Sequence, residues 1–121
     1  MRFLLTPWIA LLASCSTPNE REQDRLMAFI ENRVELPKNA SPLNAYARYY
    51  AKDGHGRIVG VYTNLPGLPK NEFYDVQIGH RKWVDDYRAL PMIFEGGCGV
   101  VSFKFNPQTQ KFETPACNLD A

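Results

Sequence analysis

Residues 17–36 carry apolar side chains at the spacing of one helical face, which predicts an amphipathic helix. Thr17-Pro18-Asn19-Glu20 supplies a start signal, because Thr17 and Glu20 can exchange capping hydrogen bonds and proline suits the first helical position. Pro37 disfavours helical backbone at Leu36 and ends the element. The apolar face consists of Leu26, Met27, Phe29, Ile30 and Val34.

From residue 45 the apolar period changes to two. Residues 45–52 and 57–64 flank Asp53-Gly54-His55-Gly56, a pattern that predicts a β-hairpin with a glycine-rich turn. We expect Ala47 and Ala51, being small, to let the helix approach their face of the sheet closely. The opposite face of the first strand carries Tyr46, Arg48 and Tyr50.

The rest of the chain reads as further short strands. Residues 73–78 and 80–84 are strand-like on either side of Gly79, where a bend fits better than a flat strand. Residues 85–90 suit a turn, and residues 91–94 suit a short strand or an extended connection. A second hairpin is predicted from 99–105 and 111–117 around Asn106-Pro107-Gln108-Thr109. The order predicts an α+β fold, with one N-terminal helix packed on an antiparallel sheet of four to five strands.

The first fifteen residues have the order of an export signal. Arg2 precedes an apolar run, and small residues then lead to Cys15. The run from residue 3 to residue 14 is shorter than the roughly 20 residues that a membrane-spanning helix needs. Two alternatives are a cleaved secretory peptide without lipid and a buried N-terminal helix, although Pro7 would break such a helix.

Leu12-Ala13-Ser14-Cys15 resembles the lipobox of bacterial lipoproteins, whose cysteine becomes the lipidated first residue of the mature chain. The resemblance implies that residues 1–14 are a signal peptide and that 15–121 form one small domain, lipid-anchored at Cys15. It also implies a place in the cell envelope, facing the periplasm. Ser16, where aspartate would indicate inner-membrane retention in enterobacterial lipoproteins, favours the outer membrane.

If Cys15 is lipidated, Cys98 and Cys117 remain, and an exported domain of this size favours a disulfide between them. The second predicted hairpin also brings the two residues near one another, within the reach of a disulfide. The alternative is a reactive thiol at Cys98, but no Cys-x-x-Cys spacing supports it.

The charge balance excludes a general affinity for nucleic acid. The chain has 14 basic and 13 acidic residues, and removal of Arg2 with the signal would leave 13 of each. No phosphate-binding loop or nucleophile elbow is present, and no cofactor is expected. His80, Asp85 and Asp86 have no metal-ligand spacing, so no metal site is predicted.

Aromatic residues are dense, and some must point outward if the strands alternate. We expect an exposed binding surface formed by Tyr46, Arg48, Tyr50, Arg81 and Trp83, with the loop 65–70 beside it.

The block from Leu90 to Val101, followed by a strand–turn–strand and a cysteine near the terminus, resembles small uncharacterised proteobacterial envelope proteins. The leading hypothesis is a non-enzymatic binding or scaffolding module, with the membrane and an envelope protein or peptidoglycan as partners. The alternatives are a structural component without a ligand, and an enzyme or accessory domain acting on envelope glycans. The residues that could serve such an enzyme are His80, Asp85, Asp86 and Glu95.

Overall fold

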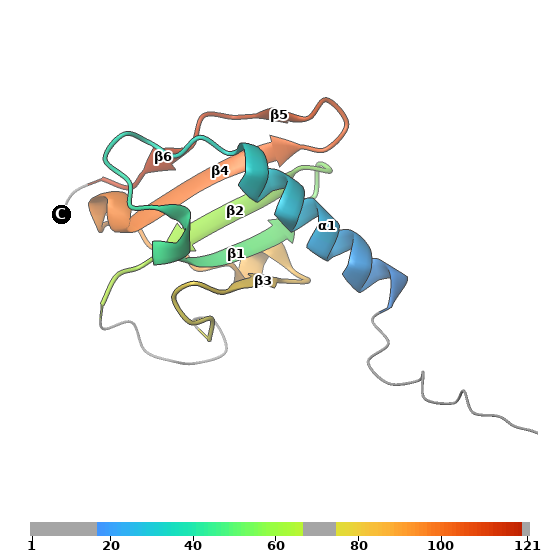
Figure 1. Ribbon diagram of the computed structural model, residues 1–121, viewed down its shortest axis with the longest axis horizontal. Helices are drawn as coiled ribbons and strands as arrows, with labels where there is room; N and C mark the ends of the chain where they lie inside the picture. The colour runs from blue at the N-terminus through green and yellow to red at the C-terminus, as the bar shows by residue number, and fades with distance from the viewer. Residues whose placement is uncertain (1–16, 67–74, 120–121) are drawn as a thin grey trace, which may run out of the picture.

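The computed structural model describes residues 17–66 and 75–119, so the predicted signal, Cys15, Phe73 and Tyr74 lie outside the described residues. One helix lies on a six-stranded sheet, which confirms the α+β expectation of one helix on a sheet (Figure 1). The elements are α1 (Pro18–Arg33), β1 (Ala47–Lys52), β2 (Ile58–Thr63), β3 (Arg81–Trp83), β4 (Val100–Asn106), β5 (Lys111–Phe112) and β6 (Ala116–Cys117). Three short 3₁₀ turns occupy η2 (Leu43–Ala45), η3 (Tyr87–Ala89) and η4 (Gly97–Gly99).

The start of α1 confirms the predicted capping box. Thr17 Oγ1 accepts a hydrogen bond from the Glu20 amide at 3.1 Å, and Glu20 Oε1 accepts one from the Thr17 amide at 2.9 Å. The helix ends at Arg33, before the predicted stop at Pro37, because Val34 already has extended backbone dihedrals. The predicted apolar face packs on the sheet, with Met27 and Ile30 buried in the core.

The sheet has the order β3-β1-β2-β4-β5, and β6 also pairs with β4. The two predicted hairpins form, with Tyr49 opposite Val61 in the first and Phe105 opposite Phe112 in the second. The second hairpin's return strand is broken. Val101 pairs with Cys117, so one extra residue lies between β5 and β6, as in a β-bulge, and Pro115 has no amide to donate there.

The expectation of a wholly antiparallel sheet is wrong at one edge, because β3 pairs parallel to β1, with Tyr50 opposite Trp83. The physical reason is the direction of the chain. Thr63 at the end of β2 lies opposite Ala47 at the start of β1. A connection that leaves this end and returns to it must run along the free edge of β1 in the same direction. The His80 carbonyl then accepts from the Arg48 amide at 3.0 Å.

Both faces of β1 are buried. Helix α1 covers the face that carries Tyr46, Arg48 and Tyr50, which corrects the expectation that it would lie on the alanine face. On the opposite face, the Val76 amide donates to Tyr49 Oη at 3.2 Å. The tyrosine face fits beneath the helix because it interlocks with the apolar side chains of α1, β2 and β4.

The predicted disulfide between Cys98 and Cys117 is confirmed, with 4.5 Å between the two Cα atoms. It joins η4 to β6 at the end of the sheet. The Cys98 carbonyl also accepts a hydrogen bond from Tyr46 Oη at 2.6 Å, and that hydroxyl accepts one from the Ser41 amide at 2.9 Å. The disulfide corner is therefore connected to the core beneath the helix.

Candidate functional site

Three of the five residues expected to form a binding surface lie inside the protein. Tyr46 and Tyr50 have no exposed surface, and Arg48 is 5% exposed. The prediction that Tyr46, Arg48 and Tyr50 form an exposed patch is therefore wrong. Alternation along β1 correctly placed them on one face, but that face is the one α1 covers.

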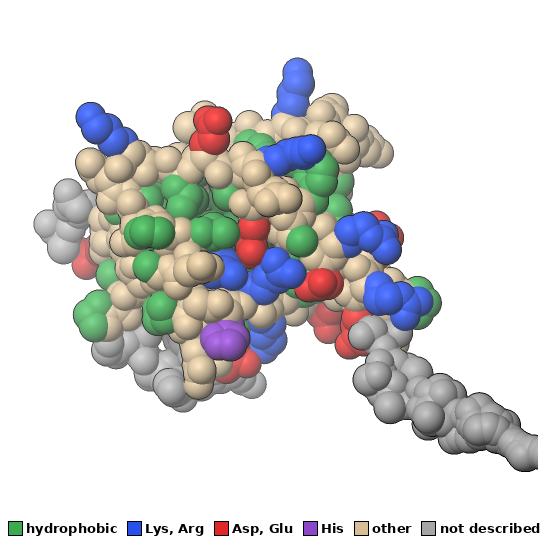
Figure 2. All heavy atoms as spheres, viewed as in Figure 1, with side chains coloured by type: hydrophobic (Ala, Val, Ile, Leu, Met, Phe, Trp, Pro, Cys, Tyr) green, Lys and Arg blue, Asp and Glu red, His purple; other side chains and the backbone are tan. Residues whose placement is uncertain are grey.

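Glu31 of α1 explains how an arginine is accommodated there. Glu31 Oε2 accepts hydrogen bonds from Arg48 Nε at 2.9 Å and from Tyr50 Oη at 2.7 Å. Glu31 Oε1 accepts from Arg81 Nη1 at 2.9 Å. We call Glu31, Arg48, Tyr50 and Arg81 the Glu31 cluster; Figure 2 shows acidic and basic side chains gathered along α1 near β1 and β3. Its groups are engaged with one another, so the cluster joins helix to sheet and offers no free group for binding.

Tyr50 and Tyr62 extend the Glu31 cluster into the core, with their hydroxyl oxygens 2.5 Å apart. Because Tyr50 donates its proton to Glu31, Tyr62 donates to Tyr50. Burial is the largest cause of a raised pKa for both phenols. The Tyr62 hydroxyl and the Glu31 charge raise the pKa of Tyr50 further.

We expect the fold to lose stability in alkali because of these two tyrosines. Their pKa values are higher in the folded state than in the unfolded state. The two tyrosines therefore contribute their full stabilisation below about pH 10, and this contribution falls at higher pH because the unfolded state loses its phenol protons before the folded state does. Above pH 10 the free energy of unfolding should fall by up to about 2.7 kcal/mol per pH unit. Urea denaturation at pH 8, 10 and 11 measures this slope, and Tyr62→Phe should halve it. Equal stabilities at pH 8 and 11 would contradict the prediction.

Arg81 and Trp83, the other two expected surface residues, are partly buried on the edge strand β3. Arg81 Nη2 donates to Asp24 Oδ1 at 2.8 Å, in addition to its bond with Glu31. Trp83 packs against the core while lining a hollow at the start of α1. Trp83 therefore lies beside Tyr50, as the sequence grouped them, but it remains partly exposed while the tyrosines are buried.

The residues considered for glycan chemistry or metal binding are exposed and separate. Asp86 Oδ2 pairs with Arg88 Nη2 at 2.9 Å, and this hydrogen bond holds the pKa of Asp86 below its usual range. Asp85 lines a hollow that is bordered by none of His80, Asp86 and Glu95. Within residues 17–66 and 75–119, no three His, Cys, Asp or Glu side chains are grouped as a metal site.

The strongest candidate for a binding site lies on the face of the sheet away from α1. A hollow of about 410 Å³ opens there, and we call it the sheet-face hollow. Val59 and Val61 of β2 form part of it, and the segment after η3 completes it. Asp53, His55 and Lys104 lie at one end. The apolar lining consists of Val59, Val61, Tyr87, Leu90, Pro91 and Met92.

Asp53 supplies an unusual polar group at the end of this hollow. Its Oδ1 accepts from the His55 amide at 2.7 Å and the Arg57 amide at 2.9 Å, which shapes the turn. Its Oδ2 is buried without a hydrogen bond, and Lys104 Nζ lies 4.0 Å away. Burial raises the pKa of Asp53, but these backbone bonds and the Lys104 charge outweigh it, so the pKa is lowered. The hollow therefore combines an apolar lining with a carboxylate at its end whose Oδ2 is buried beside Lys104.

Large apolar side chains stand exposed beside the hollow and beyond it. Met92 is 69% exposed, Phe94 76% and Leu119 80%. The backbone that carries them is held in place, since Asn118 Nδ2 donates to the Ile93 carbonyl at 2.5 Å and the Glu95 carbonyl at 3.1 Å. We call Met92, Phe94 and Leu119 the exposed apolar residues. The strand pattern in the sequence does not predict that these three side chains are exposed. They are exposed because they lie outside the layers formed by α1 and the sheet.

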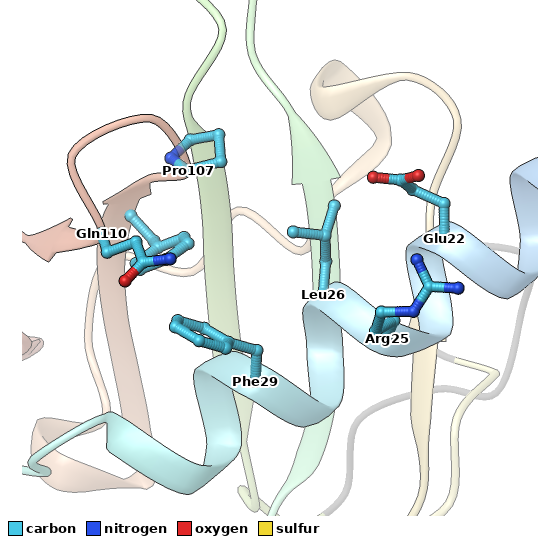
Figure 3. A pocket seen from close by; sticks show the side chains of 7 residues that line it. Glu22, Arg25, Leu26, Phe29, Pro107 and Gln110 are labelled. Carbon is cyan, nitrogen blue, oxygen red and sulfur yellow. The ribbon is translucent and has the colours of Figure 1, made fainter.

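A smaller cavity of about 120 Å³ lies between α1 and the β4–β5 turn (Figure 3). Leu26 and Phe29 point from the helix toward Pro107 and Gln110, while Glu22 and Arg25 stand at the side nearer the helix start. The cavity has room for one small apolar group and provides no arrangement for catalysis.

Comparison with known proteins gives no relative: no family model, curated protein or solved structure matches the chain. In the described part of the chain, α1 is too short and too polar to cross a membrane, and no other helix could do so.

Proposed function

We propose that this protein is a small lipid-anchored protein of the bacterial cell envelope, and that it binds a partner protein through the sheet-face hollow. The observation that carries the proposal is the apolar lining of that hollow beside the exposed Met92. The anchor rests on the lipobox-like Leu12-Ala13-Ser14-Cys15, with Cys15 as the lipidated residue and the domain facing the periplasm. Ser16 favours the outer membrane over the inner.

The lining of the sheet-face hollow supports binding in preference to catalysis. Ligand sites are mostly apolar with a few polar groups that set orientation, and the hollow has this composition. Methionine is flexible and polarisable, so Met92 can adapt to an apolar side chain inserted beside it. An anchored apolar side chain in a pocket is typical of the centre of a protein interface. The partner is therefore expected to insert an apolar side chain into the hollow.

A photoreactive residue in place of Met92 tests this proposal in the native envelope. We expect one discrete crosslinked protein, and none from the same residue placed at Asn32, which is exposed on α1. The captured protein, once purified, should bind the wild type and lose affinity roughly tenfold or more to Met92→Asp, as expected at the centre of an interface. Identical crosslinking from both positions, or crosslinking to peptidoglycan alone, would contradict a protein partner at this hollow.

The anchor is tested separately. We expect Cys15→Ser to move the protein from the membrane fraction to the soluble fraction. The reason is that the variant lacks acyl groups, and no helix among its described residues can span the membrane in their place. Fractionation with immunoblotting measures this change, and Cys98→Ser serves as the matched control for loss of a cysteine. Retention of the Cys15→Ser protein in the membrane would overturn the anchor.

A further inference from the structure

A second hollow, of about 540 Å³, lies where α1 begins. Asn19 and Glu22 of the first helical turns border it, together with Lys52 at the end of β1, Trp83 of β3 and Asp85. We call it the helix-start hollow. It is distinct from the sheet-face hollow, and the two have no lining residue in common.

The charged side chains around the helix-start hollow are exposed to solvent. In the part of the chain that the structure describes, no hydrogen bond or ion pair engages the side chains of Glu22, Lys52 or Asp85. Charged side chains of both signs therefore border one hollow, where water and not another protein group solvates them. Trp83, which lines the same hollow, is held in position because it packs against the core. The arrangement suits a ligand that itself carries both a negative and a positive group.

The position of the hollow in the chain indicates which ligand is near. Cys15 is two residues before Thr17, so an extended chain places it at most about 7 Å from the helix cap. The headgroup layer of a bilayer is roughly 5–8 Å thick on each side. An acylated Cys15 therefore brings the start of α1, with Asn19 and Glu22, to the level of the lipid headgroups.

We propose that the helix-start hollow binds the phosphoethanolamine headgroup of a membrane phospholipid. Lys52 binds the phosphate, Glu22 and Asp85 accept hydrogen bonds from the ammonium group, and Trp83 lies at the membrane interface. This inference rests on the lipid anchor of the proposed function. A purely anionic headgroup fits less well, because it would meet two carboxylates and one lysine.

Such contact also orients the domain. In Figure 1, α1 begins at one end of the molecule, and β6 and the C-terminus lie at the other. Glu95 and Phe94 are tied to that far end through Asn118, which follows β6. Binding of the headgroup at the helix start therefore directs the exposed apolar residues Phe94 and Leu119 away from the membrane, toward a partner in the periplasm.

Trp83 provides the experiment, because Trp8 is removed with residues 1–14 and Trp83 is then the only tryptophan. The acylated protein is reconstituted in vesicles of phosphatidylethanolamine with phosphatidylglycerol, with bromine on the acyl chains as quencher. We expect strong quenching of Trp83 fluorescence. The variant that combines Trp83→Phe with Phe94→Trp places the single tryptophan at an exposed site on the opposite end and should be quenched little.

Soluble headgroup analogues test the charge pattern with the acylated protein in detergent. Glycerophosphoethanolamine should change Trp83 fluorescence, and glycerophosphoglycerol should do so only at higher concentration. Glu22→Gln combined with Asp85→Asn should remove this preference. Lys52→Gln should lower the affinity for both analogues roughly two- to fivefold. Glu35→Gln and Lys38→Gln, which change exposed charges away from the hollow, are the matched controls and should behave like the wild type.

Flotation of the same vesicles separates the two proposals. Protein that floats but shows no Trp83 quenching would overturn headgroup binding while leaving the anchor intact. Protein that does not float would overturn the anchor and the headgroup site together. A fluorescence change caused by a peptidoglycan disaccharide, with none from glycerophosphoethanolamine, would show a glycan site and overturn the headgroup assignment.

Discussion

Replacement of Glu31 with alanine should destabilise the fold by about 3–5 kcal/mol, the usual cost of removing one partner from a buried ion pair. The side chains of Arg48 and Glu31 are only 7% and 11% exposed, so Arg48 would be left buried with its charge uncompensated. The Tyr50 hydroxyl would lose its acceptor in the same step. A domain of this size has a total stability of roughly 5–15 kcal/mol, so the loss is large.

Urea denaturation followed by Trp83 fluorescence measures this change. Glu31→Gln should cost less than Glu31→Ala, because an amide oxygen can still accept from Arg48 or Tyr50. Asp24→Ala is the matched control. It removes the other carboxylate that binds Arg81, and the Asp24 side chain is 68% exposed. That loss should stay within about 1 kcal/mol, as for exposed pairs. A Glu31→Ala protein as stable as the Asp24→Ala protein would show that the cluster does not hold the helix to the sheet.

The free energy of unfolding of the double variant Cys98→Ser with Cys117→Ser should be about 3 kcal/mol lower than that of the wild type, because a disulfide that closes a loop of this length stabilises by about that amount. The two cysteines are 19 residues apart in the sequence and join η4 to β6. The main contribution comes from restricting the unfolded chain, so the native contacts of the corner should largely persist. The Tyr46 hydroxyl still has its acceptor, which is the backbone carbonyl at residue 98.

The measurement compares urea midpoints of the wild type with and without reductant, together with the double variant. The reduced wild type and the double variant should have similar midpoints, both lower than that of the oxidised protein. Ser102→Ala, at a partly buried position of β4 near β6, controls for a small change in the same region. Equal midpoints for the oxidised and reduced protein would contradict a stabilising disulfide.

Local signals predicted much of the fold. The start of α1 could be predicted because Thr17 and Glu20 satisfy the helix end by themselves. The first hairpin depends on a short turn, where Asp53 Oδ1 binds two following amides. Cys98 and Cys117 could be paired because the second hairpin controls their spacing. Each of these interactions joins residues close in sequence or neighbouring strands, so the necessary information lies in a short segment.

The errors arose where the outcome depended on distant segments. The parallel pairing of β3 depends on the path of the connection after β2, which residue type alone does not specify. The helix could have covered either face of β1, and alternation along the strand is the same in both cases. Glu31 follows Met27 by four residues and therefore borders the apolar face of the helix. That spacing was the one available signal for a buried partner of Arg48.

The amino-acid sequence by itself determined the helix, the two hairpins and the cysteine pair, because hydrogen bonding and periodicity over a few residues specify them. Only the tertiary structure decided which residues reach the surface. It placed Arg48 and Tyr50 beneath α1, left Met92 and Phe94 exposed, and brought Val59 of β2 beside Leu90 in one hollow. Burial and the shape of a site depend on how separate layers pack, and this packing joins side chains that are far apart along the chain.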